Sequence, residues 1–351
     1  MRILARLLRK LLRRRKPKRL SEPERALRYL WRRIENDGAD EFRPQLERPD
    51  LLVFQFGKVG SMALQMGAIA AGYNAFHCHA LSTPELAREQ RQLLGSPASA
   101  QALSGGIRRL HRATLLRLLV NWYRGNKAKN GRLLKVVTLT RDPVEWYRSS
   151  LKQRFDRERD SILAWYRLNA PNADGEDIGA AMSLLLERVM AGVPPLRPAE
   201  DADAAIASAK QGLEAAAPAD LMLRLEIQRC MGGLVWFDRE VQALLGLDIL
   251  AAPELRSRGI VRLQNDFVDL LALRFEQLTA DMPEIARFLD VPEFRLPSRN
   301  RSAEKLGADV VDTAFDAALA TPAGQAYVAE MRATRFAQAC GYDRMEIPAP
   351  A

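Results

Sequence analysis

Cysteine, histidine and long apolar runs are all scarce in this sequence of 351 residues. The three cysteines, Cys78, Cys230 and Cys340, are too few and too scattered for a disulfide framework or a structural zinc site. No run approaches the roughly 18–20 apolar residues that span a bilayer, which excludes an integral membrane protein. About half of the residues are nonetheless hydrophobic, so the chain can bury a core. We expect a cytoplasmic protein with reduced thiols.

The positive charge of the chain is confined to one end. Lys and Arg exceed Asp and Glu by ten, which by itself would suggest a nucleic-acid-binding protein. Residues 1–20 contain ten basic residues and no acid, however, which leaves 43 basic and 43 acidic residues over 21–351. Because residues 21–351 have no net charge, the sequence argues against binding to nucleic acid. The function of the excess positive charge must be sought in residues 1–20.

Residues 1–20 have the pattern of a basic amphipathic helix. Leucines and Ile3 recur on one face, arginines and Lys10 lie on the other, and Pro17 ends the helix after about 21 Å. A helix of this length suits the interface of an anionic membrane, where each basic residue contributes roughly 1 kcal/mol. We expect residues 1–16 to attach the protein to the inner face of a membrane. The alternatives are a solvated tail or an organelle presequence; a secretory signal would need a longer apolar region and a cleavage site.

Strand and helix patterns alternate along the remainder of the chain. Short apolar runs predict strands at 51–56, 75–81, 133–140 and 267–275. Amphipathic stretches predict helices at 62–71, 107–124, 144–155, 281–290 and 308–339, and a mostly helical insertion at about 156–250. A capping box at Ser21–Glu24 starts an earlier helix, which ends at 36–38. This order predicts an α/β domain at 51–345, with a P-loop-like parallel sheet flanked by helices, after a helical lead-in at 21–50.

Two sequences at strand ends carry the chemistry, because ligands of parallel sheets bind beyond the carboxyl ends of strands. Gly57-Lys58-Val59-Gly60-Ser61 follows the first strand, so backbone N–H groups at 59–62 and the Lys58 ammonium can hold a phosphate or sulfate. Arg141-Asp142-Pro143 follows the third strand, and Ser149 lies two turns along the next helix. A guanidinium and a hydroxyl of this kind can bind a dianionic phosphate. The alternative for the 57–61 sequence is a plain turn without a ligand. The alternative for Arg141 is an ion pair at the protein surface.

Together these motifs resemble those of the sulfotransferase superfamily, and most closely the branch of bacterial carbohydrate sulfotransferases and capsular polysaccharide synthesis proteins. The 57–61 loop resembles the family's 5′-phosphosulfate loop, and Arg141 with Ser149 resembles its 3′-phosphate site. Residues 273–278 and 288–292 resemble a late strand and the turn after it. Asn300, Ser302 and Lys305 resemble a polar stretch that lies late in the sequences of related family members and near their cofactor. Met62 is a departure, since many members have a threonine there.

The resemblance implies transfer of a sulfuryl group from 3′-phosphoadenylyl sulfate (PAPS) to a hydroxyl or amine of a carbohydrate or glycolipid, without a metal. Lys58 would then neutralise charge on the bridging oxygen. Backbone N–H groups from Val59 to Met62, with the Ser61 hydroxyl, would hold the 5′-phosphate. Competing hypotheses are a kinase-like phosphotransferase, although the loop lacks the Walker A spacing, and a non-catalytic membrane-tethered scaffold.

A general base must take the acceptor's proton in such a reaction. His77 and His79 are separated by one residue, so they share a face of the predicted strand, and the usual pKa of imidazole near 6.5 suits proton transfer. We prefer His79, which is nearer the strand's end; Glu276 and Asp238 are reserve candidates. The alternative to a catalytic role is that both histidines are half-buried structural residues. The aromatic residues Trp146, Tyr147, Trp165 and Tyr166 are candidates for a sugar cleft, but we expect most of them to pack in the core.

Overall fold

The structure is a computed structural model. It describes residues 21–37, 45–57, 59–84, 86–87, 90–91, 100–126, 132–194, 218–297 and 307–345. The predicted helix at 1–20 lies outside the described residues, and so do four of the predicted site residues, Lys58, Asn300, Ser302 and Lys305.

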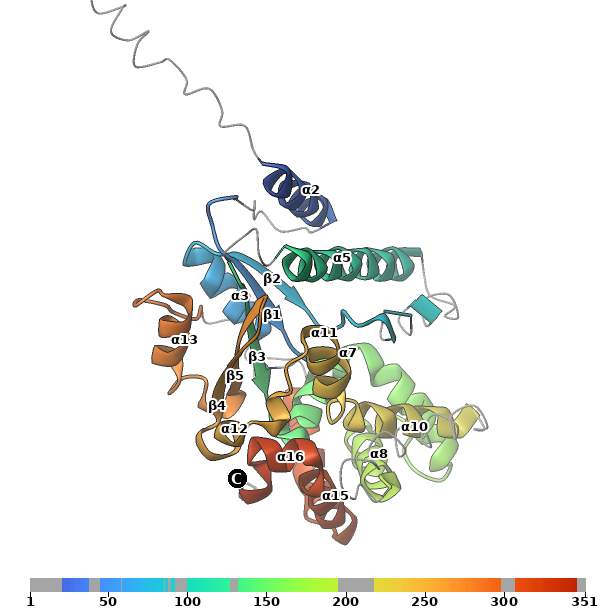
Figure 1. Ribbon diagram of the computed structural model, residues 1–351. Coiled ribbons are helices and arrows are strands. Elements are labelled where there is room, and N and C mark those ends of the chain that lie inside the picture. The colour runs from blue at the N-terminus through green and yellow to red at the C-terminus, as the bar shows by residue number, and fades with distance from the viewer. Residues whose placement is uncertain are drawn as a thin grey trace, which may run out of the picture.

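A five-stranded sheet forms the centre of the α/β fold, with the strand order β2-β1-β3-β5-β4 (Figure 1). The strands are β1 (Asp50–Phe54), β2 (Asn74–Cys78), β3 (Leu134–Thr140), β4 (Ile260–Gln264) and β5 (Val268–Arg274). The first three and β5 are parallel to one another, as the alternation of strands and helices predicts, and Val53 of β1 pairs with both His77 and Val137. β1 is buried along its whole length, which explains its continuous apolar sequence.

The edge strand β4 is the one strand of the described sheet that the sequence pattern did not predict. It runs antiparallel to β5, so the sheet is mixed rather than wholly parallel. Its sequence, IVRLQ, is short, and two polar side chains interrupt it. The expected turn at 265–266 is present and joins the two strands. The Asn265 side chain closes it by accepting hydrogen bonds from the backbone N–H groups of Phe267 and Val268, at 3.1 and 3.0 Å.

Helices cover both faces of the sheet (Figure 1). On one face lie α3 (Ser61–Ala70) and α13 (Met282–Leu289), and on the other α5 (Ala100–Gly125), on which α2 (Glu22–Asp37) packs. The α2 helix has the bounds that its capping box and the 36–38 stop predict. No helix of the described residues combines the length and the apolar character needed to cross a membrane.

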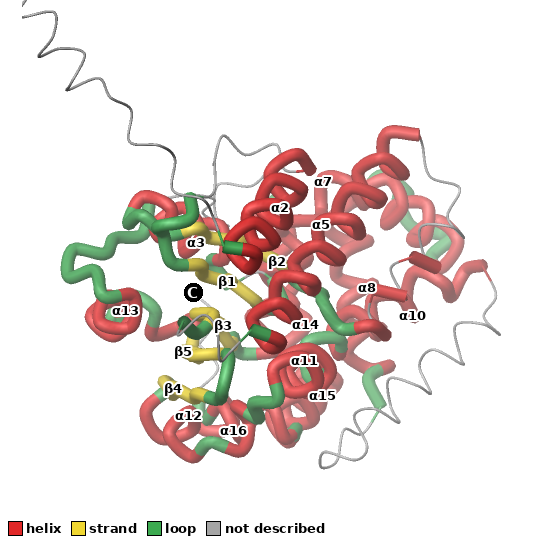
Figure 2. The backbone as a smooth tube through the Cα atoms, turned by 45° about the horizontal axis from the view of Figure 1, so that its top comes forward, coloured by secondary structure: helices red, strands yellow, loops and turns green. Residues whose placement is uncertain are grey.

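The remaining helices lie beside the sheet, most of them in a second region of their own (Figure 2). They are α7 (Pro143–Asn169), α8 (Ile178–Gly192), α10 (Pro218–Met231), α11 (Ala243–Leu245), α12 (Pro253–Arg258), α14 (Ala308–Leu319), α15 (Pro322–Ala333) and α16 (Arg335–Cys340), together with the short helical turns η1 (Phe237–Gln242), η2 (Ile249–Ala251), η3 (Phe275–Gln277) and η5 (Tyr342–Arg344).

Two helix predictions in this region were wrong in their bounds. The helix expected to end at 155 continues to Asn169, because Ile162, Leu163, Trp165 and Tyr166 extend its buried side. The single helix expected at 308–339 is three helices. Thr321, followed by Pro322, and Thr334 each accept a hydrogen bond from a backbone N–H three residues later, so each caps a new helix.

Candidate functional site

The two predicted anion-binding segments lie side by side. β1 and β3 are neighbouring parallel strands, so the glycine turn after β1 and Arg141 after β3 leave the same edge of the sheet. The segments are also bonded directly, because the indole Nε1 of Trp146 in α7 donates to the backbone oxygen of Gly57 at 3.1 Å. Gly57 and the start of α7 are therefore held together directly.

The turn after β1 depends on its two glycines. Gly57 and Gly60 have φ angles of +99° and +79°, which L side chains rarely adopt. A Cβ at Gly57 would also lie 3.3 Å from Cε1 of His79. Gly60 caps α3 without a side-chain hydrogen bond, and the first turn of α3 contains no acid. The positive end of the α3 dipole is therefore not neutralised by its own residues, which is the requirement for binding an anion.

Phe275 connects the turn to Arg141. The guanidinium carbon of Arg141 lies 4.6 Å from the centroid of the Phe275 ring. A Cβ at Gly60 would lie 3.4 Å from Cε2 of the same ring. Burial lowers the pKa of Arg141, while Glu276 acts in the opposite direction. Arg141 and Gly60 thus lie against the same aromatic ring.

The start of α7 is itself occupied by carboxylates. Asp142 accepts hydrogen bonds from the backbone N–H groups of Val144 and Glu145, at 2.9 and 3.2 Å, and Glu145 adds a second acid to the first turn. An anion near α7 would therefore depend on the Arg141 side chain rather than on the helix dipole. Ser149 lies on the buried side of α7, with only 5% of its surface exposed.

Glu276 holds the turn between β3 and α7 in place. Its Oε1 accepts from the backbone N–H of Asp142 at 2.9 Å, and its Oε2 accepts from the Tyr342 hydroxyl at 3.1 Å. Burial raises the pKa of Glu276, and these two bonds lower it. Both carboxylate oxygens are therefore engaged, one of them by the backbone of the residue that follows Arg141. Asp238, the other reserve base, forms an ion pair with Arg335 at 2.7 Å.

The two histidines lie next to the glycine turn, but in different surroundings. β2 ends at Cys78, earlier than expected, so His77 is the last but one residue of the strand and His79 lies just beyond it. Their ring centroids are 4.4 Å apart. Burial lowers the pKa of His77 to about 3, whereas the His79 side chain is exposed. Nδ1 of His79 is 2.7 Å from the backbone oxygen of Gln55, so a proton on Nδ1 leaves Nε2 as the basic nitrogen.

A π-helical turn, η1, supports the segment after β2, and the sequence analysis did not predict it. Trp236, which precedes η1, donates from Nε1 to the His79 oxygen at 2.7 Å. Glu240 is completely buried and accepts from the backbone N–H groups of Leu81 and Ser82 and from the Ser82 hydroxyl, at 2.7–2.9 Å. The pair Gly232-Gly233 was the available signal, since a Cβ at Gly233 would lie 2.8 Å from the Phe56 ring.

The aromatic residues near the site are part of the core. Trp146, Tyr147, Trp165 and Tyr166 are each at most 9% exposed, in line with the expectation that most of them pack internally. A cavity of about 20 Å³, lined by Val59, Arg141 and Trp146 among others, marks where the turn meets α7. It has room for about one water molecule.

Among the described residues, no group of three or more His, Cys, Asp or Glu side chains is arranged to hold a metal ion. Comparisons of the chain with family models, with curated proteins and with solved structures found no match.

Proposed function

We propose that the chain is a sulfotransferase that transfers a sulfuryl group from PAPS to a hydroxyl or amine of a carbohydrate or glycolipid. The proposal is supported chiefly by one observation: the glycine turn after β1 and Arg141 after β3 meet at Phe275. A nucleotide with phosphates at both ends of its ribose requires two anion-binding groups from different strands, held a fixed distance apart.

The glycine turn fits the phosphosulfate end of the donor. Glycine at positions 57 and 60 permits the two positive φ angles and brings the backbone close to the rings of His79 and Phe275. The backbone N–H groups of residues 59–62 and the Ser61 hydroxyl would hold the 5′-phosphate, and Lys58 would neutralise the bridging oxygen. Arg141 and Ser149 would hold the 3′-phosphate, with Glu276 positioning Arg141. Bound there, the donor supplies an activated sulfuryl group, so catalysis depends mainly on positioning and charge neutralisation.

His79 is the proposed general base. Donation from its Nδ1 to the Gln55 oxygen orients the ring and leaves Nε2 to take the acceptor's proton. His77, with its pKa lowered to about 3, is neutral at pH 7 and too weakly basic for this role. Its ring instead packs against that of His79.

Isothermal titration with 3′,5′-ADP and with 5′-AMP tests the proposal. We expect Arg141→Ala to weaken binding of 3′,5′-ADP roughly 10–100-fold, the value of one charge-assisted contact to phosphate, and to leave 5′-AMP binding nearly unchanged. Arg159→Ala, at an exposed position of the same helix, is the matched control. Binding of Mg-ATP but not of 3′,5′-ADP would instead support the kinase-like alternative.

For the amino-terminal segment we propose attachment to an anionic membrane, and hence a cytoplasmic enzyme peripheral to the inner leaflet. The ten basic residues at 1–20 support this. Sedimentation with vesicles of phosphatidylcholine, with and without phosphatidylglycerol, measures it. Glutamate substitutions at Arg13, Arg14 and Arg15 are expected to abolish binding to the anionic vesicles, and equal sedimentation of the substituted and unchanged chains would contradict the proposal.

A further inference from the structure

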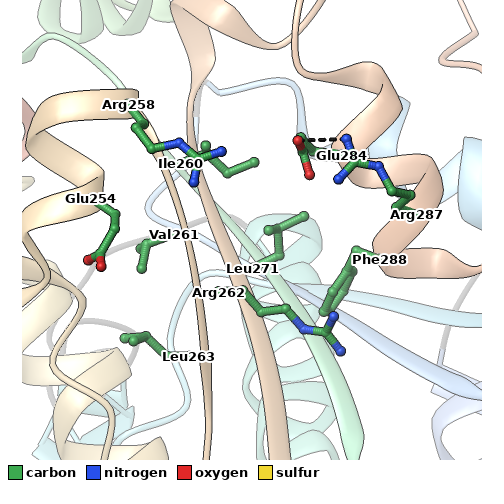
Figure 3. A pocket seen from close by; sticks show the side chains of 10 residues that line it. All are labelled: Glu254, Arg258, Ile260, Val261, Arg262, Leu263, Leu271, Glu284, Arg287 and Phe288. Carbon is green, nitrogen blue, oxygen red and sulfur yellow. Dashed lines mark hydrogen bonds and ion pairs between the residues drawn. The ribbon is translucent and has the colours of Figure 1, made fainter.

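A groove runs along the free edge of the sheet, at β4. Its volume is about 390 Å³, and it contains none of the predicted site residues. α12 contributes Glu254 and Arg258 on one side, and α13 contributes Glu284, Arg287 and Phe288 on the other (Figure 3). The floor between the helices is β4 itself, so the groove follows the strand.

The backbone of β4 directs hydrogen-bonding groups toward this groove that bond to no other described part of the chain. The Gly259 oxygen accepts from the Arg274 N–H at 2.8 Å, and the Asn265 N–H donates to the Val268 oxygen at 3.0 Å. In an antiparallel pair, bonded residues alternate, so 259, 261, 263 and 265 face β5. The N–H and C=O groups of Ile260, Arg262 and Gln264 therefore point away from it. No other described strand pairs with this edge.

The walls of the groove combine apolar surface with guanidinium groups. Val261 and Leu263 lie on the side of α12, and Ile260, Leu271 and Phe288 lie on the side of α13 (Figure 3). Apolar side chains thus lie on both faces of the sheet next to β4. A peptide in an extended conformation points its successive side chains to opposite faces, so it could contact both groups.

The charges that reach solvent at the groove are mainly positive. Arg262 pairs with Asp269 at 2.6 Å, but the Arg262 side chain is 57% exposed and the Asp269 side chain only 7%. Arg287 pairs with Glu284 at 2.7 Å, with exposures of 71% and 30%. Arg258 adds a third guanidinium at the rim, and Glu254 adds an exposed carboxylate on the side of α12. An approaching chain therefore meets three guanidinium groups and the Glu254 carboxylate before it meets the carboxylates of Asp269 and Glu284.

We propose that the free edge of β4 binds an extended acidic segment of a partner protein, which adds a sixth strand to the sheet. Three residues with outward backbone groups provide the main-chain hydrogen bonds of strand addition, and flanking pockets provide selectivity for side chains. The three arginines select acidic residues. A second copy of this chain is a poorer occupant, because an antiparallel pairing that uses all three outward residues places Arg262 opposite its own counterpart.

Amide hydrogen exchange measured by NMR with two synthetic peptides tests the proposal. The probes are a ten-residue peptide of alternating Val and Glu, and the same peptide with Lys in place of Glu. The Val-Glu peptide is expected to slow exchange at Ile260, Arg262 and Gln264, and to leave Val261 and Leu263, which already bond to β5, unchanged. Arg258→Glu is expected to weaken peptide binding roughly tenfold, and Arg28→Glu on the exposed face of α2, the matched control, is expected to have no effect.

Three results would overturn this inference. No change in exchange at the three outward amides with millimolar Val-Glu peptide would show that the edge does not accept a strand. Equal protection by the Val-Lys peptide would remove the selectivity for acidic residues. Protection that rises with protein concentration in the absence of peptide would identify a second copy of the chain as the occupant. Since the groove contains none of the proposed nucleotide-binding residues, 3′,5′-ADP binding remains an independent measurement.

Discussion

The carboxyl group of Asp50 is expected to make the fold less stable as the pH rises. Asp50 starts β1 and is 3% exposed, and burial raises its pKa from the ordinary 3.8 to about 7. The Tyr123 hydroxyl donates to it at 2.6 Å and the Asn74 amide at 2.9 Å, and both bonds lower the pKa. These contacts join α5, β1 and β2 at the amino ends of the two strands, whereas the glycine turn lies at the carboxyl end of β1.

The size of the effect follows from the difference between the two pKa values. In the unfolded chain Asp50 loses its proton near pH 4, and in the folded chain near pH 7. Between these values the folded state binds more protons, so raising the pH favours unfolding. A difference of about three pKa units corresponds to about 4 kcal/mol of unfolding free energy, present below pH 4 and lost by about pH 7.

Asp50→Asn keeps the side chain neutral and is expected to remove this loss. The free energy of unfolding, measured with urea at several values between pH 5 and pH 8, should then fall more steeply with pH in the unchanged protein than in the variant. Asp160→Asn, at an exposed position, is the control. If the difference between the Asp50→Asn variant and the unchanged protein is the same at pH 5 and at pH 8, the folded chain does not hold Asp50 protonated, and the reasoning fails.

Two further predictions concern the histidines and their support. Given the proposed function, His79→Gln is expected to lower kcat at least 100-fold, the lower end of general-base contributions, while His77→Gln lowers it much less; turnover of radiolabelled PAPS measures both, and a larger loss from His77→Gln would reverse the assignment. Glu240→Ala is expected to lower the free energy of unfolding by about 3 kcal/mol, because it leaves the buried N–H groups of Leu81 and Ser82 without an acceptor. Urea unfolding beside the exposed control Glu187→Ala measures this, and similar losses in the two variants would contradict it.

Local sequence patterns identified much of the sheet and its flanking helices. β1, β3 and β5 are mainly apolar runs between turn residues, which is the pattern of a buried parallel strand. α2 and α7 begin where a capping residue and a proline predict. β4 was missed because an edge strand carries exposed polar residues such as Arg262 and Gln264, which weaken an apolar pattern five residues long.

The contacts that hold the candidate site in place were harder to predict from the sequence. Arg141 and the glycine turn follow strands, so their position at one edge of the sheet is a matter of topology. Trp236 and Glu240, in contrast, reach the segment after β2 from more than 150 residues away. Such contacts depend on how the helical region packs against the sheet, and one sequence does not encode that packing in any local spacing. The burial of Ser149 likewise depends on which side of α7 the later helices cover.

The hydroxyl of Tyr342 is bonded both to Glu276 and, at 2.8 Å, to Thr140. A side chain of the turn η5 therefore completes a cluster whose other members lie in strand β3 and in the turn η3 that follows β5. During synthesis on the ribosome, this cluster stays open until residue 342 has left the exit tunnel. Nascent chains truncated before Tyr342 are accordingly expected to form most of the sheet while leaving Arg141 poorly anchored.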